Sequence, residues 1–383
     1  MLRTYKYKLY NSKKLKHIHN SVNIAGIIYN HSIALHKRYY KLFGKHLNKY
    51  QLQKHITKLK KIEKHKFWNK LGSQAIQNIT DRIDNAYKKF FDYVKGKTKS
   101  RISPPSFKKV KKYKSFTLKG TVGYKIIDNI IYLNGYKHKF WLSREIKGEI
   151  KTLIIKRDNI GDFYICISLD KEDNKDNKDN KDNIATGKNV GIDFGLKKFL
   201  VMSDYTEIES PLFHLKNLGK LKILNRSLSR KKKGSRHRKE SKLKLSKLHI
   251  SISNQRKDYF HKLSNYLANK YDNIIIEDLN IKSMQIMWGR KISDLAFSEF
   301  VCILESKANV TKIDRFYPSS KTCSSCFSVN KEVNKNLKDL NKRTFKCDSC
   351  GLNIDRDYNA SLNILRVGIS TLSIDTVSPA LAG

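Results

Sequence analysis

Long apolar runs and acidic side chains are both scarce in this sequence. No stretch of its 383 residues approaches the roughly 20 apolar residues of a membrane span, so we expect no membrane partner. The N-terminus lacks the apolar core of a secretion signal, which favours a cytoplasmic protein. Only 34 residues are Asp or Glu, whereas 79 are Lys or Arg, and the formal net charge is +45. Because this charge is spread along the whole chain, it predicts nucleic acid rather than an acidic membrane as the partner, and no small-molecule substrate is expected.

Cysteine is infrequent too, and six cysteines are too few for a disulfide scaffold in a chain of this length. Four of them form two Cys-x-x-Cys pairs separated by twenty residues, a spacing typical of a zinc ribbon. Four thiolates leave no open position for water, so the zinc is expected to be structural. Cys166 and Cys302 stand alone in apolar surroundings and are interpreted as core residues. The predicted zinc ligands are Cys323, Cys326, Cys347 and Cys350.

The apolar pattern divides the chain into a front half and a back half, joined by a repeat over 171–183 that contains no apolar residue. The front half begins with a strand over 1–11, continues with three amphipathic helices between 18 and 94, and is mainly β over 107–168. One of its predicted strands is Lys139–Leu142. The repeat has nothing to bury, so we interpret it as a linker.

The third predicted helix carries short polar side chains away from its apolar stripe. Ser73, Gln74 and Gln77 are of a kind that contacts DNA base edges as well as phosphates, so they are candidates for recognising a short DNA motif. The alternative is an ordinary solvated helix face, and the pattern leaves that alternative open.

A strongly basic segment lies between Arg226 and Lys247, where eleven residues are Lys or Arg and only Glu240 is acidic. Like charges at helical spacing repel one another, and the phosphates of a nucleic acid would offset that repulsion. We therefore predict that this segment holds a nucleic-acid backbone. The candidate contacts are Arg226, Arg230, Lys231, Lys232, Lys233, Arg236, Arg238 and Lys239.

Asp193 interrupts a short apolar strand over 189–194, where a lone buried carboxylate costs several kcal/mol unless it is paired or binds a metal. Gly191 and Gly195 flank it, and we interpret their missing side chains as room for the close approach of a ligand. The alternative is a satisfied structural aspartate at the end of a strand.

Two further carboxylates stand at comparable positions. Glu277 ends a run of isoleucines that reads as a buried strand, and Asp357 opens the last apolar-periodic helix. Helix capping is the alternative for Asp357, and it is the better interpretation for Asp355. Clustered carboxylates are the ligands that magnesium prefers, and two such ions about 3.5–4 Å apart serve phosphodiester hydrolysis.

Together these motifs resemble the TnpB family, RNA-guided relatives of type V CRISPR effectors that bacterial insertion sequences encode. The segments GIDFGLKKFLVMSD, IIIEDLN and DRDYNASLNIL are similar to the family's three RuvC motifs, with the zinc ribbon inserted before the third. SQAIQNITDRIDNAYKKFF and the following SPPSFKKVKKYKSFTL resemble its front half. The sequence departs from the family pattern at Tyr205 and Phe327, each of which stands where glycine is common.

The resemblance implies a multidomain fold of mixed α and β structure. It comprises a split, WED-like β-barrel, an inserted helical recognition lobe, and a ribonuclease-H-like RuvC domain that carries the zinc ribbon. The barrel would contain 1–11 and 107–170, the lobe 12–106, the linker 171–183, the RuvC domain 184–317 and 353–371, the ribbon 318–352, and a C-terminal tail 372–383.

The resemblance also implies cleavage of double-stranded DNA beside a short transposon-adjacent motif, at sites selected by a guide RNA from the element's end. Asp193, Glu277 and Asp357 correspond to the catalytic carboxylates that hold two magnesium ions, with activated water as the nucleophile. The implied partners are the guide RNA, the target DNA and, functionally, the element's transposase. The implied role is retention of the element during transposition.

Three alternatives make different demands on the sequence. A nuclease-inactive, RNA-guided repressor or transposition accessory protein typically lacks acids of the triad, whereas all three positions are acidic here. A zinc-ribbon RNA-binding protein would require three separately placed acids to be incidental. A junction resolvase without a guide would not need so large a basic front half.

Overall fold

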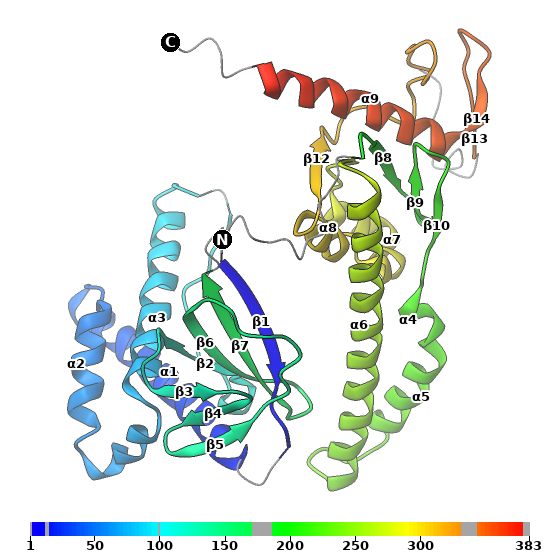
Figure 1. Ribbon diagram of the computed structural model, residues 1–383. Coiled ribbons are helices and arrows are strands. Elements are labelled where there is room, and N and C mark those ends of the chain that lie inside the picture. Colours follow the sequence, from blue (N-terminus) through cyan, green and yellow to red (C-terminus); the bar gives the residue numbers. More distant parts are fainter. Residues whose placement is uncertain (1, 12–14, 99, 171–185, 331–342, 378–383) are drawn as a thin grey trace. The chain divides into compact units, whose positions relative to one another are not determined.

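The computed structural model describes residues 2–11, 15–98, 100–170, 186–330 and 343–377 (Figure 1). The chain forms two compact units, Met1–Asn177 and Lys178–Gly383, and each contains its own hydrophobic core. The repeat that was predicted to be a linker lies outside the described residues. Among the described helices, none combines the length and the apolar character that crossing a membrane requires.

The first unit combines α-helices with two antiparallel β-sheets. Its elements are β1 (Leu2–Lys8), α1 (Leu15–Phe43), α2 (Lys49–Leu59), the 3-10 helix η1 (Glu63–Lys70), α3 (Ser73–Val94), the 3-10 helix η2 (Val110–Lys112), β2 (Ser115–Lys119), β3 (Tyr124–Ile127), β4 (Ile130–Leu133), β5 (Tyr136–Lys139), β6 (Glu149–Arg157) and β7 (Phe163–Asp170). The three helices that the 3.6-residue periodicity predicted are therefore present.

The larger sheet of the first unit has the antiparallel order β1-β7-β6-β2, so the N-terminal strand pairs with the last strand of the unit (Figure 1). Strands β3, β4 and β5 form a second sheet, and a bridge between Leu9 and Phe140 links the two. Both residues are fully buried in the core that Ile18 and Val22 of α1 share. A closed barrel remains a prediction.

The β4–β5 hairpin differs from the prediction. The return strand spans Tyr136–Lys139 rather than Lys139–Leu142, and Trp141 is 61% exposed. Asn134 and Gly135 form the two-residue turn with φ angles of 48° and 81°. Asn-Gly is favoured in such turns because both central residues need positive φ. The Asn-Gly turn therefore starts β5 at Tyr136, earlier than the apolar runs predict.

The second unit is built around a five-stranded sheet. Its elements are β8 (Asn189–Phe194), β9 (Lys198–Met202), β10 (Glu207–Glu209), α4 (Phe213–Lys216), α5 (Leu218–Ser229), α6 (Arg236–Lys270), β11 (Asn273–Glu277), α7 (Ile281–Leu295), α8 (Phe297–Glu305), β12 (Asn309–Ile313), β13 (Thr344–Lys346), β14 (Asn353–Asp355) and α9 (Arg356–Val377). Helix α9 continues into the segment that was predicted to be a C-terminal tail.

The sheet of the second unit has the order β10-β9-β8-β11-β12, in which β8 runs antiparallel to β9 and parallel to β11. Alternate residues of the central strands face opposite sides. Ile192 and Ile274 pack with Phe260 of α6, whereas Ile275 packs with Ile364 of α9. Helices α6 and α8 therefore cover one face, and α9 lies across the other (Figure 1).

Gly191 lets α9 lie directly on β8. A Cβ atom at Gly191 would be 2.2 Å from the carbonyl oxygen of Ser361, and one at Gly195 would be 2.5 Å from that of Lys198. The interpretation that these glycines make room for a ligand is therefore wrong, because the chain's own backbone fills both spaces.

Tyr205 and Phe327, which replace glycines of the family pattern, both have left-handed backbones with φ angles of 65° and 63°. Glycine adopts this conformation at little cost, whereas other residues are strained in it. Both rings contact α9: Tyr205 stacks on Tyr358 with ring centroids 3.9 Å apart, and the Arg366 guanidinium lies 3.9 Å from the centroid of Phe327. These contacts offset part of the strain.

Substitutions at Tyr205 separate its strain from its stacking. Tyr205→Ala loses the ring contact and keeps the strained φ, so we expect it to lower the free energy of unfolding by about 1 kcal/mol. Tyr205→Gly loses the same contact but relieves strain of about 1–2 kcal/mol, so it should be more stable than the alanine variant. Urea unfolding measures both values, and equal stability of the two variants would show that the backbone is not strained.

Candidate functional site

Asp193, Glu277 and Asp357 come from three elements that meet on the α9 face of the sheet. Asp193 lies in β8 and Glu277 ends β11, each one residue beyond the parallel pair Ile192–Ile276. Side chains at equal register on neighbouring parallel strands point to the same face. Asp357 lies in the first turn of α9, the helix that packs on that face.

The electrostatics of these carboxyls reflect their proximity. Burial raises the pKa of Asp193 well above its usual range, and the negative charges of Asp357 and Glu277 raise it further. Burial, followed by the charge of Asp278, raises the pKa of Glu277 to about 7. The three acids are partly buried, and their charges interact, so this region holds a concentration of negative charge that a bound cation would offset.

The acids are more widely spaced than the cysteines. Among the described residues, only the four cysteines bring three or more ligand atoms within 4.8 Å of one another. Asp357 forms ion pairs with two arginines: its carboxylate oxygens lie 3.5 Å from Arg356 Nη2 and 3.6 Å from Arg343 Nη1. The donor set fits magnesium because every ligand is a carboxylate oxygen, and a divalent cation would cancel the repulsion that raises the pKa of Asp193.

Asp355 has the capping role that the sequence suggested. Its Oδ1 atom accepts hydrogen bonds from the backbone N–H groups of Asp357 (2.9 Å) and Tyr358 (3.0 Å) at the start of α9. The capping interpretation is confirmed for Asp355. The cap also fixes the backbone that carries Asp357.

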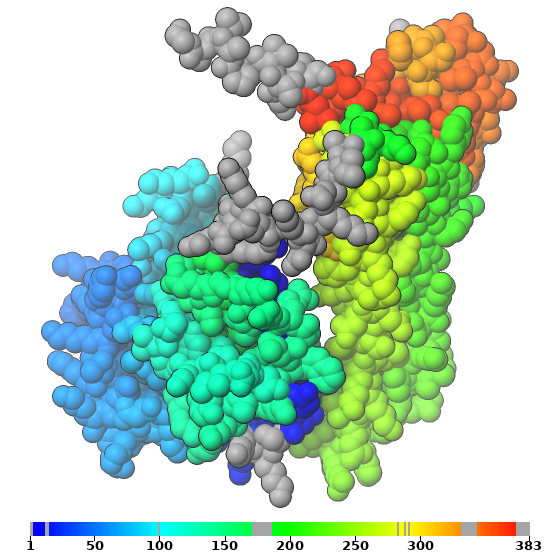
Figure 2. Space-filling view, viewed as in Figure 1, coloured from blue at the N-terminus to red at the C-terminus, as the bar shows by residue number. Residues whose placement is uncertain are grey.

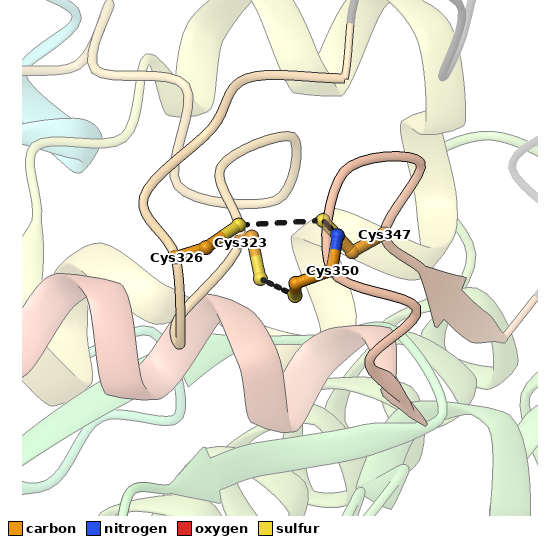
Figure 3. A group of neighbouring side chains, drawn as sticks. All are labelled: Cys323, Cys326, Cys347 and Cys350. Carbon is orange, nitrogen blue, oxygen red and sulfur yellow. Dashed lines mark hydrogen bonds between the residues drawn. The ribbon is translucent and has the colours of Figure 1, made fainter.

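The four predicted zinc ligands converge from two loops, and their sulfur atoms point toward one another (Figure 3). The Sγ atoms of Cys323 and Cys350 are 3.6 Å apart, and those of Cys326 and Cys347 are 3.5 Å apart. Four sulfurs about 2.3 Å from a tetrahedral zinc ion would be separated by about 3.8 Å, so the geometry fits zinc. The Ser328 hydroxyl lies 3.0 Å from Cys326 Sγ and lowers the pKa of both Cys326 and Cys347, which favours the thiolates that zinc binds.

Two asparagines of α9 attach the ribbon to the helix that carries Asp357. Asn359 Nδ2 donates to the carbonyl of Thr322 (2.7 Å), and Asn359 Oδ1 accepts from Ser324 N–H (2.9 Å). Asn363 Nδ2 donates to the carbonyls of Thr322 (2.6 Å) and Ser319 (2.9 Å). Both asparagines are fully buried, and in Figure 2 the ribbon and α9 form one continuous surface. Sequence reasoning missed this pair, although its i, i+4 spacing places both amides on one helix face.

The basic segment divides into exposed and internally bonded residues. Arg238 is partly buried and donates to the carbonyls of Leu228 (2.6 Å) and Lys231 (2.8 Å), where α5 ends. Lys231 donates to Ser241. These two cations therefore brace the α5–α6 connection, whatever else they contact. The exposed candidates are Arg226, Arg230, Lys232, Lys233, Arg236 and Lys239.

The remaining candidates lie in various environments. Ser73 and Gln77 are exposed near the start of α3, and Gln74 is half-buried, so their role in recognising DNA stays a prediction. Cys166 is half-buried in β7, but Cys302 is exposed, so the interpretation of Cys302 as a core residue is wrong. The buried face of α8 is formed instead by Phe297, Phe300 and Leu304.

Comparisons with known proteins agree with the motifs. The OrfB_IS605 family model, described as a probable transposase, matches residues 165–287, and the Cas12f1-like TNB domain model matches 297–364. A "Putative RNA-guided DNA endonuclease" of Streptomyces pristinaespiralis is 27% identical over 380 residues, which cover 96% of this chain and 90% of the relative. "Putative RNA-guided DNA endonuclease InsQ" of Escherichia coli K12 is 27% identical over 325 residues, with coverages of 79% and 76%.

The fold has a counterpart among solved structures. The cryo-EM structure of a Cas12f1–sgRNA–target DNA complex contains a chain that matches with a TM-score of 0.54 at 14% identity, covering 95% of this chain and 98% of that one. The chain thus has a multidomain fold of mixed α and β structure that resembles the fold of Cas12f1. Its four-cysteine cluster lies in the segment that matches the TNB domain. The chain belongs to the TnpB family.

The raised pKa of Glu277 predicts a pH-dependent magnesium requirement for activity at this site. A carboxyl with a pKa of about 7 keeps its proton below that pH, and the proton competes with the metal. We expect the magnesium concentration for half-maximal DNA cleavage to rise about tenfold for each pH unit below 7, if one proton is displaced. Titrations of cleavage against magnesium between pH 6 and 8 measure it.

Asp278→Asn provides a matched control for this prediction. The charge of Asp278 contributes to the raised pKa of Glu277, so its removal should move the pH profile to lower pH. Asp278 is bonded to Arg315 and lies next to the proposed metal ligand. If the magnesium concentration for half-maximal cleavage were the same at every pH, Glu277 would not bind magnesium in competition with a proton. A pH profile that does not shift in Asp278→Asn would contradict that role as well.

Proposed function

We propose that this protein is a magnesium-dependent endonuclease that cuts double-stranded DNA at sites selected by a guide RNA. The guide RNA derives from the end of the insertion element, and cleavage requires a short adjacent DNA motif. The observation that carries the proposal is the joint position of Asp193, Glu277 and Asp357 on one face of the sheet, with charges that raise the pKa of Asp193. Two relatives named as RNA-guided DNA endonucleases support it.

The topology of the second unit supports its assignment, in this proposal, to a ribonuclease-H-like RuvC domain. The order β10-β9-β8-β11-β12 pairs an antiparallel β8–β9–β10 meander with the parallel strands β11 and β12. Asp193 lies in β8, the first strand of this sheet in chain order, and Glu277 lies in β11, the fourth. We assign 184–317 and 353–371 to this domain, 318–352 to the ribbon, and the first unit to the barrel and recognition lobe.

In this proposal the three carboxylates bind and orient two magnesium ions, which when bound supply the charge stabilisation for phosphodiester hydrolysis. The Asp355 cap and the β8–β11 pairing hold the carboxylates in place. Arg343 and Arg356 lie within ion-pair distance of Asp357, and their positive charges partly neutralise that carboxylate. The exposed cations of the α5–α6 connection hold the guide–target backbone.

The test begins with the RNA that co-purifies with the protein expressed from its own locus. A discrete RNA that ends at the element boundary is expected. That complex should then cut a plasmid library, with randomised sequence beside the target, only in magnesium and only beside one motif. Replacing the guide segment should redirect the cut. Guided binding without cleavage would instead support the repressor, and random cellular RNA would support a general RNA-binding protein.

A further inference from the structure

A basic cavity in the first unit has the composition of a nucleotide-binding site. It has a volume of about 530 Å³ and lies between the start of α1, the end of η1 and the β4–β5 turn. Ligand pockets for small organic molecules span roughly 300–1,000 Å³, so a single nucleotide fits within that range. Ser21 and Ile24 of α1 are its buried lining residues.

The charges around the cavity favour an anion. Lys16 and Lys70 line it, no acidic side chain does so among its described residues, and neither lysine pairs with an acid in the described part of the chain. A phosphate bound between two such ammonium groups would gain charge-assisted hydrogen bonds. The cavity therefore suits a ligand with a phosphate group.

The remaining polar lining suits a base. Asn20 and Asn69 contribute side-chain amides, which can donate to and accept from a base edge. Asn134 is fixed in place because its Nδ2 donates to the carbonyl of Lys70 (3.0 Å). Among the described residues, no hydrogen-bond partner reaches the buried Nδ1 atom of His17, so this polar atom is available to a ligand.

An aromatic surface completes the site. The rings of His17 and Tyr136 stack with centroids 4.1 Å apart and an interplanar angle of 23°. Tyr136 remains 46% exposed, which leaves ring surface for a base. The Asn-Gly turn sets this position, because β5 begins at Tyr136 directly after Gly135. Stacking on an exposed aromatic ring is a common way of holding an unpaired base.

We infer that this cavity binds one unpaired nucleotide of the guide RNA, with its phosphate between Lys16 and Lys70 and its base on Tyr136. RNA is favoured over DNA because proteins recognise RNA mainly through bases splayed out of loops and ends. The inference rests on the proposed guide-RNA function. It adds a specific anchoring point for that RNA, separate from the basic α5–α6 connection.

The test uses the full-length protein with the RNA that co-purifies with it. Ultraviolet crosslinking followed by mass spectrometry should join one RNA nucleotide to the peptide containing His17 or Tyr136. Tyr136→Ala should weaken RNA binding about tenfold, and Tyr136→Phe should restore most of it. Tyr40→Ala, an exposed tyrosine of α1 outside the cavity, is the matched control and should change affinity less than about twofold.

A double-mutant cycle then tests whether the base of the crosslinked nucleotide contacts Tyr136. An abasic RNA at the crosslinked position should bind as weakly as Tyr136→Ala does, and the two changes together should add no further loss. Unchanged RNA affinity in Tyr136→Ala, additive losses, or a crosslink only to target DNA would overturn the inference. If the wild-type protein cuts guided DNA but the variants bind RNA normally, only the role of the cavity is refuted. If the wild-type protein carries no RNA, the proposed guide-RNA function itself is refuted.

Discussion

Asp193→Ala is expected to abolish DNA cleavage while leaving guide RNA and target DNA binding nearly unchanged. Asp193 is the carboxylate whose pKa both other acids raise, so its removal takes a central ligand from the metal site. Metal ions contribute several kcal/mol to charge stabilisation in such reactions, so the rate should fall at least about a thousandfold. Cleavage of a guided plasmid target and gel-shift titrations on the same preparation measure the two effects separately.

Asp355→Asn is the matched control for that substitution. Asp355 lies two residues from Asp357 but caps α9, and asparagine caps helices about as well as aspartate. We expect this variant to cleave at close to the wild-type rate. Cleavage by Asp193→Ala in magnesium would show that the triad is assigned wrongly, and equal losses in both variants would indicate a structural effect.

Removal of zinc should have the second-largest effect. Structural zinc contributes about 10–16 kcal/mol of apparent binding energy to small folded sites, so a ribbon without it is expected to unfold. Asn359 and Asn363 would then lose the carbonyls that they bind and become buried amides without partners. Because both lie on the helix that carries Asp357, cleavage should be lost together with the ribbon.

Cys347→Ser and Cys302→Ser provide a matched pair for this prediction. Cys347 belongs to the four-sulfur cluster, whereas Cys302 is exposed and outside it. Zinc content should fall from one ion per chain to none in the first variant and remain at one in the second. Limited proteolysis should cut the ribbon of Cys347→Ser only. Unchanged melting and proteolysis in protein that demonstrably lacks zinc would contradict a structural role for the metal.

The sequence predicted the elements of the candidate site because each acid creates a local conflict. Asp193 and Glu277 terminate or interrupt apolar strands, and Asp355 precedes a helix at the capping position. Such conflicts are visible in a linear pattern because burial is implied by the neighbouring residues. The cysteine pairs are equally visible because their spacing fixes the ligand geometry.

Features that depend on distant parts of the chain were not predictable in this way. Asn359 and Asn363 resemble polar surface residues until the ribbon's carbonyls are placed against them. Gly191 resembles a gap for a ligand until α9 fills it. Arg238 resembles a phosphate contact, although it binds the end of α5. In each case the partner is a backbone carbonyl or helix contributed by the tertiary fold, which local periodicity does not encode.

The proposal that Asp193, Glu277 and Asp357 jointly bind two divalent cations underlies the predicted DNA cleavage. Its most direct test is a crystal structure of the protein with guide RNA and target DNA, soaked in Mn²⁺ and measured for anomalous scattering. Two anomalous peaks about 3.5–4 Å apart are expected, each in contact with carboxylate oxygens of the triad. Manganese bound elsewhere, or three carboxylates that remain apart with DNA in place, would contradict it.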